Sequence, residues 1–301
     1  MVLKYFKDQT NFGDALNPFI FNKLLPGCFD DDSDVDFFGI GSILGMDHAL
    51  SSNDRQKVIF SSGYGKYGNV PQLGNKYDIV CVRGPLTAKA LNIDPKLGVT
   101  DGAALLKFFD FPAYEKKYDY SYMPHWESEK KFDWKALCES TGVHYISPMD
   151  NYEQVLKEIL QTKVLLTEAM HGAIVADTLR VPWVPVKAYH YIVEFKWLDW
   201  ATSMDVAYEP NRITSIFTNK QHITGHINKL SKNLLPPVFG HLASNAYITY
   251  QKLSNYSKLE KDFSNLKTAP SYLSSASVLE EKSNILLEKL EYVKQKYSNK
   301  S

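Results

Sequence analysis

Short apolar runs alternate with longer segments of mixed polarity along most of the chain. In the first 117 residues, four runs rich in β-branched and aromatic residues are bounded by Gly, Asn or Asp, which is typical of buried strands. These runs are 2–6, 35–40, 57–62 and 78–84. Segments 15–25 and 85–92 have the length and polarity of helices. Such alternation predicts a parallel sheet covered by helices on both faces.

The same alternation starts again near residue 118. Strands are expected at 118–124, 142–148, 163–169 and 183–186, and helices at 133–140, 152–161 and 172–180. The pattern therefore predicts an α/β protein with two Rossmann-like, doubly wound domains, over residues 1–117 and 118–235.

The remaining segment, 236–301, is expected to be a helical C-terminal extension. Its last part, 277–297, has apolar residues at helical spacing: Leu279, Leu286, Leu290, Val293 and Tyr297. Two interpretations stay open. The stripe fits a short coiled coil that joins two copies of the chain, and it fits equally a helix docked on the chain's own body.

Charge and cysteine usage narrow the class of protein. Lys plus Arg and Asp plus Glu number 34 each, so no overall basic field is available to hold nucleic acid. The three cysteines are far apart and form neither a disulfide framework nor a metal knuckle. We expect neither a signal peptide nor a membrane-spanning helix, because the first residues and the later segments lack apolar stretches of the required length. We expect a cytoplasmic protein without a metal; a peripheral position at the inner face of the membrane stays open.

Two charged residues stand where strands of a parallel sheet end, which is where ligands bind in such folds. Arg83 precedes the helix that starts at Pro85, and its planar fork suits a carboxylate or phosphate. His171 follows the strand 163–167 and fits a general acid or anion ligand. Glu168 beside it fits an orienting group for the imidazole or a helix cap. The alternatives are an Arg paired with a carboxylate and a structural His.

Four further polar residues lie in loops after expected strands. Asn11 and Asp14 in NFGD either cap the next helix, which is the commoner use, or bind a sugar hydroxyl. Ser42 and Ser62 lie in Gly-containing loops, which bind anions through backbone N–H groups or are ordinary turns.

A second histidine, His125, also follows a strand, and Trp126 beside it offers a flat face for stacking on a sugar. The signatures of dinucleotide-binding, P-loop and GxSxG hydrolase proteins are absent.

Seven motifs, in order, resemble those of the polysaccharide pyruvyl transferase family, and most closely the bacterial exopolysaccharide ketal-pyruvyl transferases. They are NFGDALNPFIF, GIGSIL, VIFSSG, VRGPLTAKAL, GVTDGAAL, the Pro-His125 element and TEAMHGAIVADTLRVPWVPV. The resemblance covers about residues 1–205.

The resemblance implies a GT-B-like fold, in which two domains face a cleft. It also implies phosphoenolpyruvate as donor, a hexose of a lipid-linked oligosaccharide as acceptor, and neither metal nor cofactor. Arg83 and His171 match the family's basic residue and histidine. Where the family has Arg-Leu before His-Gly, this chain has Ala169 and Met170. Lys187 or Lys196 is the expected replacement for that cation; the alternative is that this branch of the family binds its donor differently.

On this basis we expect transfer of pyruvate to a sugar as a ketal, with release of phosphate. Arg83 would clamp the donor, and His171, or alternatively His125, would transfer protons. Two other functions stay open because a fold does not decide its chemistry. One is a glycosyltransferase that uses a nucleotide sugar, and the other is a sugar-binding protein without catalysis.

Overall fold

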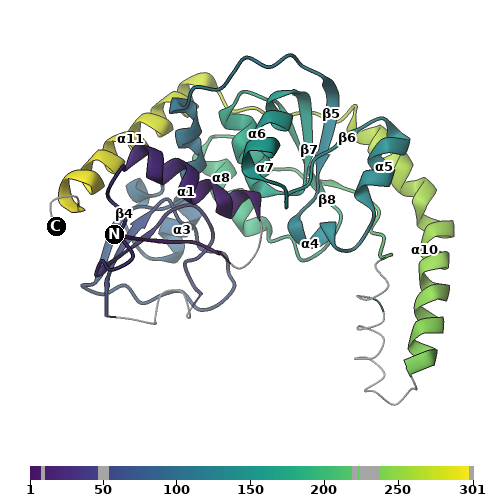
Figure 1. Cartoon of the computed structure of the whole chain (residues 1–301), viewed down its shortest axis with the longest axis horizontal. Helices are drawn as coiled ribbons and strands as arrows, with labels where there is room; N and C mark the ends of the chain where they lie inside the picture. Colours follow the sequence, from purple (N-terminus) through teal and green to yellow (C-terminus); the bar gives the residue numbers. More distant parts are fainter. Residues whose placement is uncertain (8–10, 47–53, 219–222, 224–236, 298–301) are drawn as a thin grey trace.

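The computed structural model describes residues 1–7, 11–46, 54–218, 223 and 237–297. Two parallel sheets organise the chain (Figure 1). The first contains β1 (Val2–Lys4), β2 (Val35–Phe38), β3 (Gln56–Phe60) and β4 (Tyr77–Cys81), adjacent in that order. All four strands fall on the apolar runs that the sequence pattern identifies, and all three pairings are parallel.

The second sheet has the strand order β6-β5-β7-β8-β9, again with parallel pairing. Its strands are β5 (Tyr118–Met123), β6 (His144–Tyr145), β7 (Thr162–Thr167), β8 (Trp183–Lys187) and β9 (Asn211–Arg212). The pattern predicts the first four. The fifth, β9, lies in the polar segment 209–214, which has no apolar run to indicate a strand.

The expected α/β architecture is confirmed, but the two sheets differ in how they are wound. In the second sheet the order reverses between β5 and β7, as in a doubly wound fold. The described strands of the first sheet follow chain order without a reversal, so the doubly wound expectation is wrong for them. Strand order depends on the side to which each crossover packs, and alternation along the sequence does not encode it.

Helices cover the sheets and lead into the loops at the strand ends. In the first half they are α1 (Phe12–Leu24) and α3 (Pro85–Ala90), with short 3₁₀ segments η1 (Pro95–Leu97) and η2 (Gly102–Phe108). In the second half they are α4 (Trp126–Glu129), α5 (Trp134–Thr141), α6 (Tyr152–Leu160), α7 (Met170–Thr178) and α8 (Glu194–Ser203).

The two halves share one hydrophobic core. Phe21 and Phe60 from the first half belong to the same buried cluster as Trp183 and Trp200 from the second. Helix α7 packs against η2 and α8 against α3. The division at residue 117 stays a prediction, and the boundary expected at 235 lies outside the described residues.

The C-terminal segment contains two helices, α10 (Pro237–Leu266) and α11 (Ala276–Tyr297). Helix α10 packs against α5, whereas α11 returns to the first half and contacts η2 and β4 (Figure 1). All five residues of the apolar stripe on α11 are buried in the chain's own core. The interpretation of a docked helix is therefore confirmed for this stripe. Association of two copies through α11 stays a prediction.

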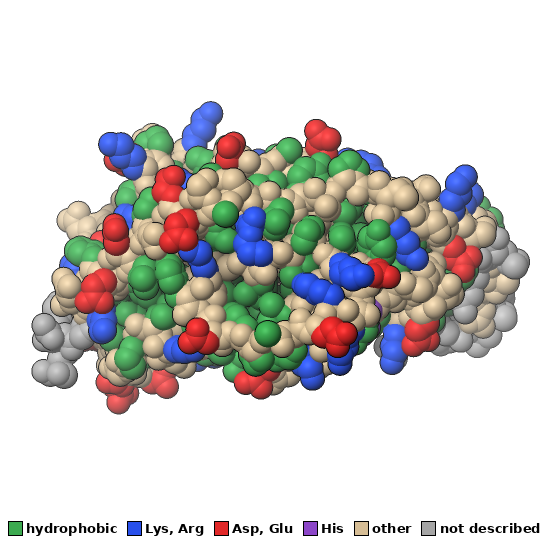
Figure 2. All heavy atoms as spheres, turned by 90° about the horizontal axis from the view of Figure 1, so that it is seen from above, with side chains coloured by type: hydrophobic (Ala, Val, Ile, Leu, Met, Phe, Trp, Pro, Cys, Tyr) green, Lys and Arg blue, Asp and Glu red, His purple; other side chains and the backbone are tan. Residues whose placement is uncertain are grey.

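Positive and negative side chains are interspersed over the face seen in Figure 2, in keeping with the equal numbers of acidic and basic residues. Within the described residues, no helix combines the length and apolar character needed to cross a membrane.

Candidate active site

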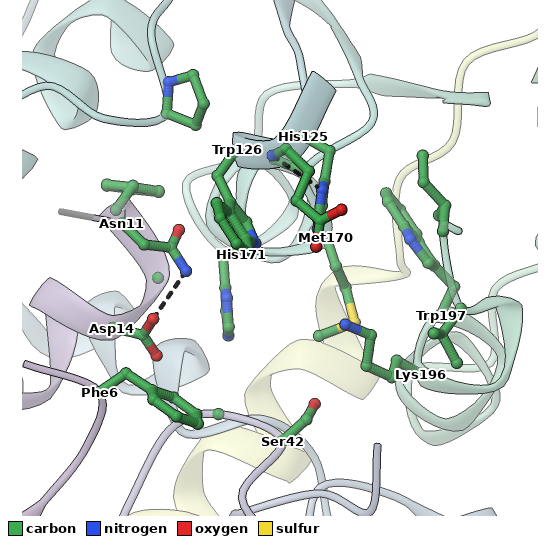
Figure 3. A pocket seen from close by; sticks show the side chains of 18 of the residues that line it. Phe6, Asn11, Asp14, Ser42, His125, Trp126, Met170, His171, Lys196 and Trp197 are labelled. Atoms are coloured by element: carbon green, nitrogen blue, oxygen red, sulfur yellow. Dashed lines mark hydrogen bonds between the residues drawn. The ribbon is translucent and has the colours of Figure 1, made fainter. Parts of the chain in front are cut away.

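A cavity of about 300 Å³ lies where loops from both sheets meet (Figure 3). Each lining segment follows the carboxyl end of a strand, where ligands bind in parallel α/β folds. After strands of the first sheet these residues are Phe6, Asn11, Phe12, Gly13, Asp14, Gly41, Ser42, Met46 and Tyr67. After strands of the second they are His125, Trp126, Glu127, Pro148, Ala169, Met170, His171, Tyr191, Ile192, Val193, Lys196 and Trp197.

His171 lies at the start of α7, and its imidazole is held from two sides. Its Nε2 atom is buried and 3.6 Å from Oδ2 of Asp101. Neither of these atoms has a hydrogen-bond partner among the described residues. On the other side, a Cβ atom at Gly13 would come within 2.0 Å of Nδ1, so only glycine lets α1 approach the ring this closely. The imidazole of His171 is thus fixed between the carboxylate of Asp101 and the backbone of α1.

Asp101 is the site residue that the sequence analysis missed. Its Oδ1 atom accepts the N–H of Ala103 and caps η2, so an Asp before Gly102 gives the local signal of a helix cap. Only the packing of η2 against α7 turns the second carboxylate oxygen toward His171.

Glu168, the expected partner of His171, is fully buried and bonded elsewhere. It accepts hydrogen bonds from the backbone N–H of Ala188, at 2.6 Å, and from the Tyr122 hydroxyl, at 3.2 Å. A third comes from the backbone N–H of His125, at 3.4 Å. Burial raises the pKa of its carboxyl group. Glu168 therefore joins the ends of β5, β7 and β8.

His125 lines the cavity in a neutral state. Its Nδ1 atom accepts the N–H of Glu127 at 3.3 Å and so caps α4. Burial, aided by the charges of Lys196 and Lys131, lowers the pKa of His125 to about 3. Because Nδ1 is the acceptor, the proton of the neutral ring is on Nε2. His125 can donate a hydrogen bond to a ligand, but it carries no extra proton at neutral pH.

Arg83 is fully buried and does not line the cavity. Its Nε atom donates to Oδ2 of Asp199 at 3.0 Å. The two terminal nitrogens donate to Oγ of Ser42, at 2.7 Å, and to the carbonyl of Tyr64, at 3.2 Å. A Cβ at Gly63 would come within 2.2 Å of the guanidinium carbon. Arg83 is thus the Arg paired with a carboxylate, and it reaches the cavity only through Ser42.

The other residues singled out from the sequence divide between the cavity and the interior. The side chain of Asn11 donates from Nδ2 to Oδ2 of Asp14, at 2.8 Å, and neither side chain caps α1. Both line the cavity, as does Ser42. Ser62 is buried and donates to the carbonyl of Gly39 at 2.5 Å. It lies outside the cavity lining.

Of the two lysines expected to replace the missing Arg, only Lys196 lines the cavity. It lies in the first turn of α8 and contacts the hydroxyl of Tyr67. Lys187 is nearly buried at the end of β8, where it pairs with Glu194.

Besides α4, which His125 caps, three helices begin at the cavity: α1, α7 and α8. Within the described residues, none of the three has its first N–H groups capped by a side chain. A helix N-terminus carries a partial positive charge and unpaired N–H donors, and so attracts anions. Together with Lys196, these termini make this wall of the cavity suited to a ligand with more than one negative group. In the described part of the chain, no cluster of three or more His, Cys, Asp or Glu is placed to hold a metal ion.

Comparison with known proteins indicates the same family as the sequence motifs. Residues 72–191 match the family described as polysaccharide pyruvyl transferase. Over 213 residues the chain is 39% identical to the succinoglycan biosynthesis protein ExoV of Rhizobium meliloti (strain 1021). The alignment covers 69% of this chain and 66% of that protein, so the chain spans just under two thirds of this relative. The chain belongs to the polysaccharide pyruvyl transferase family.

Proposed function

We propose that this protein transfers pyruvate from phosphoenolpyruvate to a hexose of a lipid-linked polysaccharide precursor, forming a ketal and releasing phosphate. The observation that carries the proposal is the placement of His171. Backed by Asp101, it faces a cavity that three helix N-termini and Lys196 make favourable for anions. We further propose a GT-B-like arrangement, with donor and acceptor bound between the two halves.

The donor carries a phosphate and a carboxylate, so its site needs several positive or N–H groups. Helices α1, α7 and α8 offer their N-termini, and Lys196 offers a cation. In this chain Ala169 stands at the start of α7 in place of an arginine, and Lys196 supplies a positive charge from a different helix. Arg83 holds Ser42, whose hydroxyl lines the cavity, and does not touch the donor itself.

Ketal formation moves two protons. Carbon 3 of the enol gains one, and carbon 2 forms bonds to two sugar oxygens as its bond to the phosphate oxygen breaks. The two hydroxyl groups lose one proton each; one balances the gain at carbon 3, and the other leaves with phosphate. Because Nε2 of His171 is buried and faces Asp101 at 3.6 Å, we assign its Nδ1 as the basic atom that removes a hydroxyl proton.

The acceptor sugar would lie toward the aromatic side of the cavity. Trp126 and Tyr191 line it there, and their flat faces suit the apolar face of a hexose. His125 contributes an Nε2–H donor for a hydroxyl group. A lipid-linked acceptor would place the reaction at the cytoplasmic face of a membrane, with the protein associated peripherally.

The test is incubation with phosphoenolpyruvate and a panel of hexose-terminated acceptors. We expect acceptor-dependent phosphate release and a matching mass gain on the sugar. His171→Ala should lower turnover by about 10²–10⁴, the usual value of a positioned proton transfer. Its circular dichroism spectrum and melting temperature should stay close to those of the wild type.

Normal turnover by His171→Ala would remove the proposed mechanism. Nucleotide sugars form the comparison arm. Sugar transfer from one of them, without any phosphate release from phosphoenolpyruvate, would establish the glycosyltransferase alternative instead.

A further inference from the structure

Asp14 lines the cavity, and the proposed reaction needs a proton donor that has not yet been assigned. It lies in the first turn of α1 and is only 8% exposed. Its Oδ2 atom accepts a hydrogen bond from Asn11. Among the described residues, Oδ1 has no hydrogen-bond partner, and it lies on the side of Gly41, another residue of the cavity wall. Figure 3 shows the carboxyl group directed into the same space as His171 and Lys196.

The position of Asp14 is held from behind. Asn17, one turn further along α1, is fully buried and bonds both backbone groups of Ile40, accepting at 2.8 Å and donating at 3.0 Å. It also donates to the carbonyl of Asp14 at 3.2 Å. These contacts fix α1 against the loop after β2, so the carboxyl group is presented to the cavity in one orientation.

The reaction needs an acid as well as a base. Carbon 3 must gain a proton while a hydroxyl on the other side of carbon 2 loses one. His171 is set up as the base, and His125 carries no extra proton at neutral pH. We propose, building on the function proposed above, that Asp14 is the acid that protonates carbon 3 of the enolpyruvyl donor.

The surroundings of Asp14 shift its ionisation in the direction that an acid needs. Burial raises the pKa of its carboxyl group, while the charges of His171 on α7 and Lys196 on α8, and the hydrogen bond from Asn11, act in the opposite direction. Binding of an anionic donor adds negative charge beside the carboxylate and offsets the positive charge of Lys196. A like charge disfavours ionisation, so the donor itself promotes protonation of Asp14.

The protons then balance. Asp14 gives its proton to carbon 3 while the first sugar hydroxyl attacks carbon 2 and loses its proton to His171. When the second hydroxyl attacks, the bond to the phosphate oxygen breaks. The proton held by His171 leaves with phosphate, and the proton of the second hydroxyl returns to Asp14. Both residues end in their starting states.

The test compares the wild type with Asp14→Asn, which has nearly the same shape but cannot act as an acid. Donor binding is followed through fluorescence of Trp126 and Trp197, which line the cavity. We expect Asp14→Asn to bind phosphoenolpyruvate with similar affinity and to lose about 10²–10⁴ in kcat. In the wild type, kcat/KM should fall on the alkaline side as Asp14 ionises, and this fall should vanish from the residual activity of the variant.

Asp14→Glu retains an acid and should recover part of the lost rate, which separates loss of the proton from loss of folding. Turnover of Asp14→Asn near the wild-type rate would overturn the proposal. An increase in the acceptor KM with kcat unchanged would also overturn it, because this pattern describes a ligand for a sugar hydroxyl. Absence of phosphate release by the wild type with any acceptor would instead overturn the proposed function, and this inference with it.

Discussion

Two histidines at neighbouring strand ends show how single contacts decide the chemistry of a residue type. His125 accepts a backbone N–H at Nδ1 and lies in a setting that opposes positive charge. His171 has a buried carboxylate beside Nε2 instead. A carboxylate in this position fixes the tautomer of the ring and stabilises the imidazolium that forms when the ring accepts a proton. The same side chain is thus a fixed donor in one place and a base in the other.

This difference predicts the effect of Asp101→Asn. The change keeps the shape of the side chain and its cap on η2, but removes the negative charge beside His171. We expect kcat to fall by about 10- to 100-fold, as for other groups that orient a functional histidine, with little change in the KM for phosphoenolpyruvate. Steady-state phosphate release measures both quantities.

Asp133→Asn is the matched control, because Asp133 caps α5 in the same way without facing a histidine. Equal activities of the Asp101→Asn and Asp133→Asn variants would show that the Asp101 carboxylate acts only as a helix cap.

At the scale of elements, α8 links the cavity to the interior of the first half. It carries Lys196 at the cavity and, three residues later, Asp199, which is fully buried. Asp199 pairs with Arg83, 116 residues away, and also accepts the backbone N–H of Thr87 at 2.8 Å. This interaction holds the start of α8 over the cavity.

Removal of one partner of this pair should destabilise the fold strongly. Asp199→Ala leaves the guanidinium of Arg83 buried without its counter-charge, which costs about 3–5 kcal/mol. Urea unfolding followed by tryptophan fluorescence gives the free energy of unfolding. The double variant Arg83→Met with Asp199→Leu buries no charge and should lose much less. If the double variant were less stable than the single one, loss of packing rather than the unpaired charge would be the cause.

At the scale of the whole molecule, the C-terminal helix packs against the N-terminal half of the chain. Helix α11 crosses back to the first half, where Lys289 donates to the carbonyl of Val80 at 2.9 Å. The hydroxyl of Tyr297 donates to Asp78 at 2.7 Å. The last helix thus completes the core behind the first sheet, on which the cavity wall with Asp14 and Ser42 depends.

Neighbouring leucines on α11 allow this contribution to be measured. Leu286 is fully buried, whereas Leu287 is 38% exposed. Leu286→Ala should lower the free energy of unfolding by about 2–5 kcal/mol, the usual range for a buried leucine. Leu287→Ala should have a much smaller effect. Equal losses for the two variants in urea unfolding, at a protein concentration where the chain is monomeric, would contradict docking through the stripe.

The sequence by itself determined the local elements and the family. Apolar runs of strand length, bounded by turn residues, identify eight of the nine described strands, because burial on both faces of a parallel sheet requires such runs. The sequence pattern did not predict helix α8, because aromatic residues are frequent throughout this segment and obscure the helical period. Positions after expected strands also identified His171, Asp14, Ser42 and His125 as candidates, and the missing arginine pointed to Lys196; all five line the cavity.

Only the tertiary structure decided how these elements meet. Arg83 follows a strand end, as expected, yet its side chain turns inward because Asp199 of a distant helix offers a buried counter-charge. Asp101 looks like a helix cap until the packing of η2 against α7 brings its second oxygen to His171. The convergence of three helix N-termini on one cavity likewise depends on contacts between distant segments. Local patterns specify which elements form, but the free energy of packing between those elements selects which strand ends and helix ends come together.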